Sequence, residues 1–240
     1  MRIAATIGMM AVTLAATVGQ SHAQEVYNWS GFYLGGQAGF VSGTAKSDDQ
    51  WNHTQPPYND RYFSEKDLSG GLIGIHAGAA QQFGAFVLGL ESDVNWSSAN
   101  GTHDYVFFDS ASGQYSDNTD EWSKLTYQWD GSVRLKAGYA FDNIMLYVTG
   151  GPAFAQAKID DHRNFSGTIH DFTGTANLLG GTIGAGVSYG VNDSIVVTGE
   201  VRYTSFGNNL IAAVDSTTDI TQLNITTSNV RATLGVSFKF

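Results

Sequence analysis

The amino-acid sequence predicts an all-β fold, an eight-stranded antiparallel up-and-down transmembrane β-barrel. Three observations predict this class. Apolar and polar side chains alternate in eight segments, as in strands whose two faces meet different environments. Short turns and long polar connections alternate strictly between these segments, which is typical of membrane barrels with short periplasmic turns and long extracellular loops. After the N-terminal leader no apolar run approaches 18 residues, which excludes membrane-spanning helices.

The N-terminal 23 residues have the pattern of a secretory signal peptide. Arg2 gives a positive start, residues 3–18 are mostly apolar, and Ser21-His22-Ala23 ends in a small-residue cleavage site. We therefore expect a removed signal peptide over 1–23 and one barrel domain over 24–240.

The mature chain is acidic and has no cysteine. Removing the leader takes away one of the 12 basic and none of the 22 acidic residues, so 11 positive and 22 negative charges leave a net charge of −11. This balance argues against nucleic acid or anionic lipid as a partner. The missing cysteines exclude disulfides and thiolate metal sites.

The C-terminal strand shows the alternation most clearly. Over 230–240 six apolar residues alternate with five small or polar ones, and eleven residues suffice for a tilted strand to cross a bilayer. Phe238 and Phe240 share the apolar face. This aromatic ending resembles the C-terminal signal by which outer-membrane barrels are recognised for insertion, so we expect the barrel-assembly machinery to read these two residues.

The other strands follow the same rule. In chain order, the eight strands are expected over residues 31–40, 70–81, 86–96, 125–139, 144–157, 176–189, 194–206 and 230–240. Short turns lie near Gly84, Asn143 and Asn192. The long polar connections are 41–68, 97–123, 160–174 and 207–225.

The alternation gives the strands apolar faces that we expect to meet lipid. In chain order these faces include Phe32 and Leu34, Ile73 and Ile75, Phe86 and Leu88, Leu125 with Tyr127 and Trp129, Leu179 and Ile183, Ile195 and Val197, and Val230 and Ala232. Strand 144–157 contains Pro152, which cannot donate to the ladder, so a bulge or kink is expected there. Interfacial aromatic anchors are expected at Trp29, Phe32, Tyr139, Phe141, Tyr203, Phe206 and Phe240.

The opposite faces carry charges that should meet inside the barrel. They are Glu91, Asp93, Asp130, Arg134, Lys136, Glu200, Arg202, Arg231 and Lys239. An eight-stranded barrel has an interior just wide enough for side chains to fill, and an unpaired charge there is costly. We expect a structural, salt-bridged plug, with a gated or leaky small pore as the alternative.

Several stretches resemble one known family. Residues 29–36 (WSGFYLGG), 86–96 (FVLGLESDVNW) and 147–151 (YVTGG), with the Phe240 ending, resemble the small outer-membrane surface-antigen family of alphaproteobacteria. Opacity proteins and OmpA-type membrane domains are more distant relatives. The resemblance implies a porin-like barrel, and some members bind haemin. These motifs are structural and carry no chemistry.

Other candidate sites are weaker. Gly186-Val187-Ser188-Tyr189-Gly190 matches G-x-S-x-G, but Ser188 lies on a strand rather than on a strand-to-helix turn, so the match is attributed to chance. No cofactor is expected; haem is the alternative, using loop residues His53, His103, His162, His170, Tyr58, Tyr62, Tyr105 and Tyr115. His76 points inward. Asp104, Asp109, Asp117, Asp120 and Glu121 lack calcium-loop spacing and are expected to be solvated.

These observations favour a non-enzymatic, monomeric barrel in the cell outer membrane, with a structural and surface-exposed role. Its expected partners are outer-membrane lipid and lipopolysaccharide, and the assembly machinery. The alternatives are a small passive porin and a haem-binding surface receptor. A lipid-acting barrel enzyme would need a lipid-facing polar triad, and the sequence offers none.

Overall fold

The chain folds into one closed, all-antiparallel barrel. The computed structural model describes residues 27–52, 59–109, 114–165, 168–214 and 220–240. The strands are β1 (Gly31–Asn52), β2 (Asn59–Phe83), β3 (Phe86–Ser97), β4 (Asn100–Asp109), β5 (Gln114–Phe141), β6 (Ile144–Phe165), β7 (Thr168–Asn192), β8 (Ile195–Val214) and β9 (Ile220–Lys239). No helix in this part of the chain is long and apolar enough to span a membrane.

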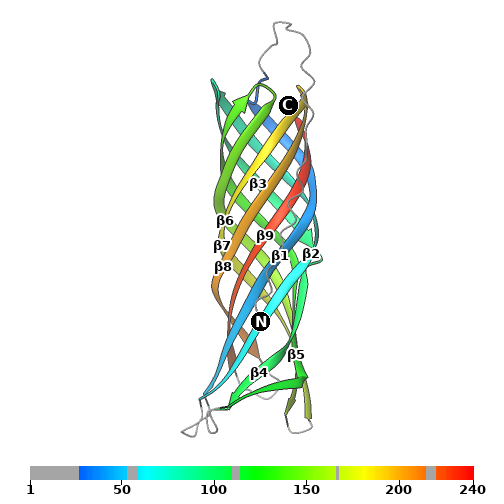
Figure 1. Cartoon of the computed structure of the whole chain (residues 1–240), viewed down its shortest axis with the longest axis vertical. Helices are drawn as coiled ribbons and strands as arrows, with labels where there is room; N and C mark the ends of the chain where they lie inside the picture. Colours follow the sequence, from blue (N-terminus) through cyan, green and yellow to red (C-terminus); the bar gives the residue numbers. More distant parts are fainter. Residues whose placement is uncertain (1–26, 53–58, 110–113, 166–167, 215–219) are drawn as a thin grey trace.

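β3 and β4 are two parts of one barrel strand, because both pair with β2 on one side and β5 on the other. β9 pairs back onto β1 and closes the sheet (Figure 1). The barrel therefore has eight strands, which confirms the predicted fold class. The predicted signal peptide lies outside the described residues and stays a prediction.

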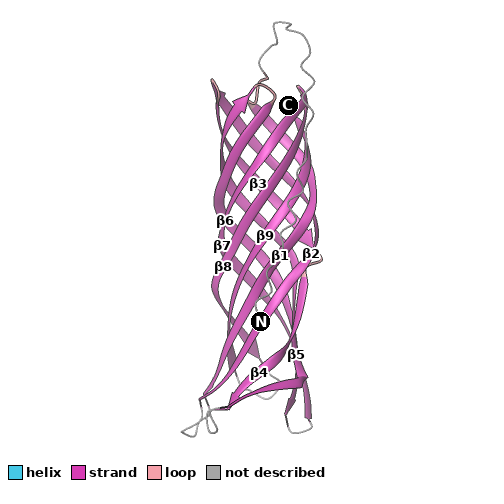
Figure 2. Ribbon diagram, in the orientation of Figure 1, coloured by secondary structure: helices cyan, strands magenta, loops and turns pink. Residues whose placement is uncertain are grey.

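The two ends of the barrel differ. Two-residue turns at 84–85, 142–143 and 193–194 lie at the end where the chain finishes, which we call the turn end (Figure 2). Gly84 and Asp142 adopt the left-handed backbone, with φ of 63° and 57°, which glycine and aspartate tolerate in tight turns. The other end, the hairpin end, carries the longer connections.

The polar connections are more regular than the sequence predicted. β1 pairs with β2 as far as Asn52 and Asn59, and β6 with β7 as far as Phe165 and Thr168, so most of the expected loop residues form hairpins. Backbone pairing needs no apolar face, and polar alternation is sufficient for a strand that stands in water. The remaining connections, 53–58, 110–113, 166–167 and 215–219, lie outside the described residues.

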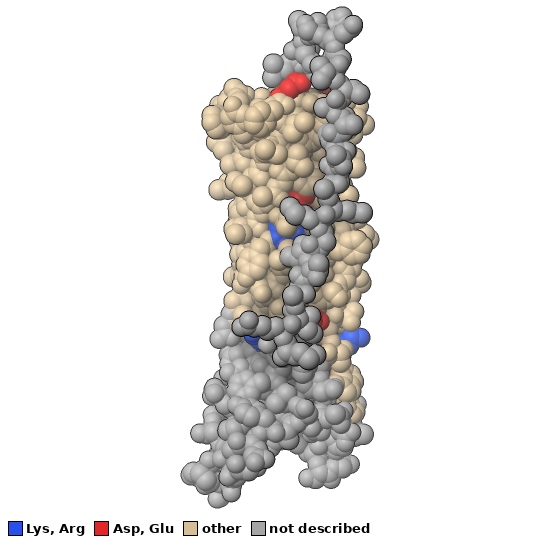
Figure 3. Space-filling view, in the orientation of Figure 1, with Lys and Arg blue, Asp and Glu red and all other residues tan. Residues whose placement is uncertain are grey.

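The polarity of the wall inverts along the barrel axis. On β6 the outward residues from Ile144 to Phe154 are apolar or small, and those that follow are Gln156, Lys158 and Asp160. The inward face changes in the opposite sense, from Tyr147 and Thr149 to three alanines and Ile159. The turn-end part is thus built for lipid, and the hairpin end is built as a water-soluble barrel with its own core. Few charged side chains interrupt the turn-end wall on the face drawn in Figure 3.

A bulge in β5 corrects one prediction. The β5–β6 register shifts by one residue between Tyr127 and Trp129. An extra residue in one strand reverses the faces beyond it. Leu125 and Tyr127, which were expected to face lipid with Trp129, are therefore buried inside the barrel, at 2% and 4% exposure.

Pro152 causes no bulge. The β5–β6 register is the same at Ser132↔Ala153 and Leu135↔Gly150, on either side of the proline. Only the pairing with Val133 and Arg134 is interrupted. The ladder thus loses the bonds that proline cannot make, without an added residue.

Two of the seven expected aromatic anchors lie inside the barrel. Phe206 is fully buried, because even-numbered residues of β8 point inward with Glu200 and Arg202. Trp29 precedes β1 and is 5% exposed, folded into the turn-end mouth. The other five, Phe32, Tyr139, Phe141, Tyr203 and Phe240, are exposed on the outer wall as predicted.

Candidate functional site in the barrel lumen

Arg134 stands at the centre of the lumen charges. Its Nη2 lies 2.5 Å from Oε1 of Glu91, and its Nη1 lies 2.6 Å from Oε1 of Glu200. The Arg134 guanidinium also lies 3.3 Å from Asp93 and is 1% exposed. One cation from β5 thus ties β3 to β8 across the barrel.

Strand register brings these groups together. Glu91, Asp93 and Asn95 are two residues apart on β3, so all three point inward. Opposite them, Glu91 is the register partner of Arg134 and Asn95 that of Asp130 on β5. The alternation that the sequence shows on each strand therefore becomes a three-dimensional cluster on closure.

Three further cations complete the network. Lys136 Nζ lies 2.6 Å from Oε2 of Glu91. Arg202 Nη1 lies 2.9 Å from Oδ1 of Asp93. Its Nε lies 3.0 Å from Glu200 Oε1, an ion-pair contact without hydrogen-bond geometry.

Arg231 Nη1 lies 2.5 Å from Oδ1 of Asp130. Asn95 links this pair to the rest, since its amide nitrogen donates to Asp93 at 2.5 Å and to Asp130 at 3.0 Å. Within the described residues the network therefore joins four carboxylates to four cations and is electrically neutral.

Hydroxyl groups satisfy the remaining carboxylate oxygens. Tyr33 donates to Oε2 of Glu91 at 2.7 Å, Tyr147 donates to Oε2 of Glu200 at 3.0 Å, and Ser132 donates to Asp93. Such partners are what make buried charge tolerable. The sequence prediction omitted the two tyrosines, Ser132 and Asn95 from the site, although all four share the inward parity of the charged residues.

Lys239 does not join the network. Its ammonium donates to the carbonyl of Asn28 and lies 4.4 Å from the centre of the Tyr27 ring. Lys239 has the same alternation as the inward residues of β9, but it stands at the last position of that strand. Its side chain therefore lies in the turn-end mouth and not beside the network.

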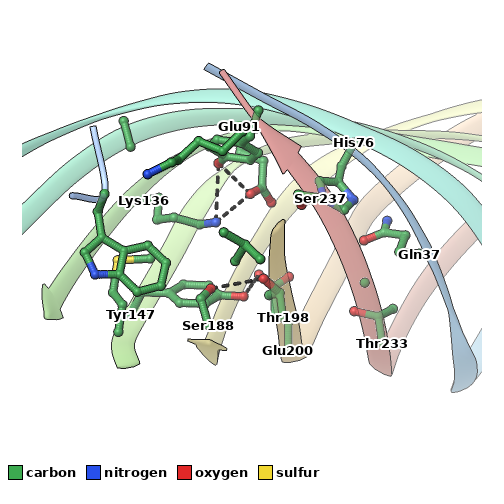
Figure 4. A pocket seen from close by; sticks show the side chains of 17 residues that line it. Gln37, His76, Glu91, Lys136, Tyr147, Ser188, Thr198, Glu200, Thr233 and Ser237 are labelled. Atoms are coloured by element: carbon green, nitrogen blue, oxygen red, sulfur yellow. Dashed lines mark hydrogen bonds and ion pairs between the residues drawn. The ribbon is translucent and has the colours of Figure 1, made fainter. Parts of the chain in front are cut away.

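A small chamber lies between the network and the turn end. Its volume is about 40 Å³, and one water molecule needs roughly 10–15 Å³ on this measure. Its lining includes Glu91, Lys136 and Glu200 from the network, together with His76 and Ser237 (Figure 4). The chamber is therefore large enough to hold water.

His76 is buried against this chamber. Its Nε2 lies 2.7 Å from the Ser237 hydroxyl, and its Nδ1 has no hydrogen-bond partner among the described residues. A Cβ at Gly35 would stand 2.6 Å from that Nε2, so β1 needs glycine beside the ring.

An N-terminal segment closes the turn end. The Trp29 indole donates to the carbonyl of Asp142 at 2.9 Å, and its backbone N–H donates to Gln82 at 2.8 Å. Tyr27 donates its hydroxyl to the carbonyl of Asn192 at 3.2 Å. These contacts reach all three short turns. Burial, and then the charge of Asp193, raises the pKa of Tyr27.

An apolar core fills the lumen toward the hairpin end, which the sequence prediction did not include. Phe206, Leu68 and Leu125 are its most buried large side chains, at 0%, 1% and 2% exposure. The other members are Val41, Ala45, Leu72, Ala99, Tyr127, Ala153, Ala155, Ala157, Ile159 and Leu178. One feature of the sequence could have predicted this core. On β6 the inward positions beyond Gly151 hold three alanines and Ile159, while the outward positions beyond Phe154 are polar.

The remaining candidates are placed apart from this site. Ser188 points into the lumen, where its hydroxyl lies 3.0 Å from that of Thr198. His162 stacks on Trp122, with ring centroids 5.6 Å apart and planes within 10°. No group of three or more His, Asp or Glu residues in the described part of the chain is placed to hold a metal.

The other loop candidates cannot be placed. The side chains of the following residues lie outside the described part: His53, His103, His170, Tyr58, Tyr62, Tyr105, Tyr115, Asp104, Asp109, Asp117, Asp120 and Glu121. Haem binding stays an untested alternative.

The C-terminal aromatic residues face outward at the turn end. Phe238 and Phe240 are 52% and 70% exposed, with ring centroids 5.1 Å apart. The backbone N–H of Phe240 donates to the carbonyl of Phe32 at 2.9 Å, so the last residue still pairs with β1.

Comparison with known proteins places this geometry in a family. Residues 11–240 match the family described as outer membrane protein beta-barrel domain. The 31 kDa outer-membrane immunogenic protein of Brucella melitensis biotype 1 is 29% identical over 224 residues, which cover 90% of this chain and 85% of the relative. The 22 kDa outer membrane protein of Rhizobium leguminosarum bv. viciae is 30% identical over 180 residues, which cover 75% of this chain and 65% of the relative.

Two solved structures share the fold. The outer membrane protease OmpT from Escherichia coli aligns with a TM-score of 0.53 at 11% identity, covering 91% of this chain and 99% of that one. The outer membrane protein OprG from Pseudomonas aeruginosa gives 0.50 at 11% identity, covering 90% and 98%. At this identity the likeness extends to the fold alone.

Proposed function

This chain belongs to the outer membrane protein β-barrel family, and from that premise we propose that it is a non-enzymatic, monomeric scaffold barrel with a plugged lumen. It is an integral outer-membrane protein. Since outer-membrane barrels keep their short turns in the periplasm, we assign the turn end to the periplasm and the hairpin end to the outside of the cell. Its role is to contribute to the envelope and to present the extracellular hairpins.

The observation that carries the proposal is that buried ion pairs and a buried apolar cluster occupy successive parts of the lumen. Four carboxylates and four cations neutralise one another across the middle of the barrel. Between this network and the hairpin end, the side chains of the apolar core occupy the lumen. A passive pore needs a continuous water path, and hydrophobic constrictions resist wetting.

The non-enzymatic reading rests on the surroundings of the candidate nucleophile. Ser188 faces the lumen and lies beside Thr198, with no histidine in its described contacts. A hydroxyl is a weak nucleophile unless an adjacent base activates it.

The test is single-channel conductance of the refolded protein in a planar bilayer, with Arg134→Ala beside the wild type. We expect both proteins to be silent, since the apolar core remains in the variant. Steady small openings in the wild type that grow in the variant would replace the scaffold with a passive porin. The chamber of about 40 Å³ is the one feature that favours that second function.

A further inference from the structure

Two lysines flank Asp160 on one outer wall of the barrel. Lys124 on β5 is the register partner of Asp160 on β6, and Lys158 is two residues before Asp160 on the same outward face. Among the side chains described at the extracellular end, Lys46 on β1 is the other outward cation. β1 lies on the opposite side of the barrel, since three barrel strands separate it from β6 on either side.

We propose that this wall, formed by β5, β6 and β7, binds the phosphorylated sugar headgroup of lipopolysaccharide in the outer leaflet. We call it the lysine wall, comprising Lys124, Lys158, Asp160, Gln156, Asn177 and Trp129. The site goes beyond the scaffold role and does not depend on whether the lumen conducts.

The height of the lysines matches a lipid headgroup. The outward apolar face of β6 runs from Ile144 to Phe154, eleven residues or about 25 Å of barrel height at a usual strand tilt. Lys158 follows Phe154 by four residues, which is roughly 10 Å higher on the same estimate. Since lysine side chains bend toward the interface, both ammonium groups can reach the sugar and phosphate layer.

The charge of the wall is complementary to phosphate. Lys158 Nζ lies 2.9 Å from Asp160, whose carboxyl also accepts a hydrogen bond from Thr173 at 3.0 Å. The hydrogen bond from Lys158 lowers the pKa of Asp160, so the carboxylate stays charged and the three groups sum to +1. The net acidity of the chain by itself disfavours an anionic lipid, with a formal net charge of −10, so this local positive charge marks the wall as the place where a phosphate group would be attracted.

The rest of the outward collar differs from this wall. Among the described side chains, the first two outward positions above the apolar band on the strands outside this wall carry no cation, and Lys46 is the third such position on β1. These first two positions are Ser42, Thr44, Asp67, Ser69, Ser98, Asn100, Ser205, Gly207, Thr226 and Ser228. Phosphate would therefore find its positive contacts on β5 and β6, while sugar hydroxyls could bond around the ring.

Polar and aromatic groups below the lysines complete the wall. The Trp129 indole donates to Gln156 at 3.1 Å, and the Gln156 amide donates to Asn177 at 3.2 Å. This amide row crosses three strands at the upper edge of the apolar band. Trp129 also packs on Phe154 with ring centroids 6.1 Å apart, an aromatic anchor of the kind found at membrane interfaces.

The experiment titrates the refolded mature protein in detergent micelles with bisphosphorylated lipid A, measured by native mass spectrometry. A lysine near an anionic lipid surface contributes about fivefold in affinity, so the double variant Lys124→Ala/Lys158→Ala should bind roughly 25-fold more weakly. Dephosphorylated lipid A should bind the wild type about as weakly as the double variant binds the phosphorylated form.

Two matched control variants decide the result. Lys46→Ala, on the opposite wall, should stay within about twofold of the wild type. Lys124→Arg/Lys158→Arg should retain binding, because the charge is kept. Equal affinity of the wild type and the alanine double variant, an equal loss in Lys46→Ala, or indifference to the phosphates would each overturn the site. The conductance of the lysine variants should equal that of the wild type, because the lysine wall lies outside the lumen. A loss of lipid A binding therefore tests this site alone, and conductance tests the scaffold proposal.

Discussion

At the scale of single residues, Arg134 shows why the lumen charges occur as a set. Taking a guanidinium out of water costs several kcal/mol, and only close partners offset that cost. Arg134 has two carboxylates within 2.6 Å, and Lys136 and Tyr33 also hold one of them, Glu91. The burial of each charged side chain in the network is therefore tolerated because the side chains of opposite charge are also present.

We expect Arg134→Gln to lower the free energy of unfolding by about 3–5 kcal/mol, since Glu91 and Glu200 would remain buried with fewer cations. The measurement is urea unfolding of the refolded protein in lipid vesicles, followed by tryptophan fluorescence.

The matched control is Lys158→Gln, which removes an ion pair of similar length whose lysine side chain is 40% exposed. Exposed pairs contribute about 0–1 kcal/mol, so the control should unfold nearly like the wild type. Equal losses in the two variants would mean that the lumen network has no special weight in stability.

At the scale of elements, β9 closes the barrel and carries the proposed assembly signal. It pairs with β1 and β8 at once, and Phe238 and Phe240 project from its end. Lipid contact alone would make these rings equivalent to any other aromatic residue of the turn-end rim. Recognition by the assembly machinery would make the last residue special.

Phe240→Ser should therefore reduce the amount of heat-modifiable barrel in cells by about tenfold or more, which corresponds to at least 1.4 kcal/mol of lost recognition if assembly follows binding. Refolding of the purified variant into vesicles should change little. Phe86→Ser is the control, because Phe86 lies on the same rim with 64% exposure and contacts Tyr139 edge-on. If both variants assemble equally well, Phe240 is only a lipid anchor.

The elements also show what the sequence could predict. Period-two alternation was sufficient for eight strands, their order and the inward charges, because lipid and lumen impose opposite chemistry on successive residues. It failed at the β5 bulge, since one extra residue near Gln128 reverses the faces of Leu125 and Tyr127 without altering the apparent alternation. It also ended the strands too early, because hairpins in water need no apolar outer face.

At the scale of the whole molecule, the barrel is two environments joined end to end. In the membrane part apolar residues face out and charges face in. Above it the pattern inverts, and the apolar core takes the lumen. This inversion was not predicted, because we expected apolar residues to face outward along the whole barrel. Phe206 was therefore assigned to the outer wall, although it lies in the apolar core. Under the proposed scaffold role, the ion pairs and the apolar core therefore act as two unlike barriers in series along the barrel axis.

Barriers in series make a specific prediction about conductance. Arg134→Ala leaves the apolar core, and Phe206→Ala leaves the ion pairs, so each single variant should remain silent in a planar bilayer. The combined variant weakens both barriers and should show brief openings that the single variants lack, because a hydrophobic constriction wets only when it is widened or made polar. Leu135→Ala/Ile183→Ala is the control, since both side chains face lipid at 71% and 65% exposure. Openings in Arg134→Ala alone would mean that the ion pairs by themselves close the lumen and that the apolar core is already permeable to water.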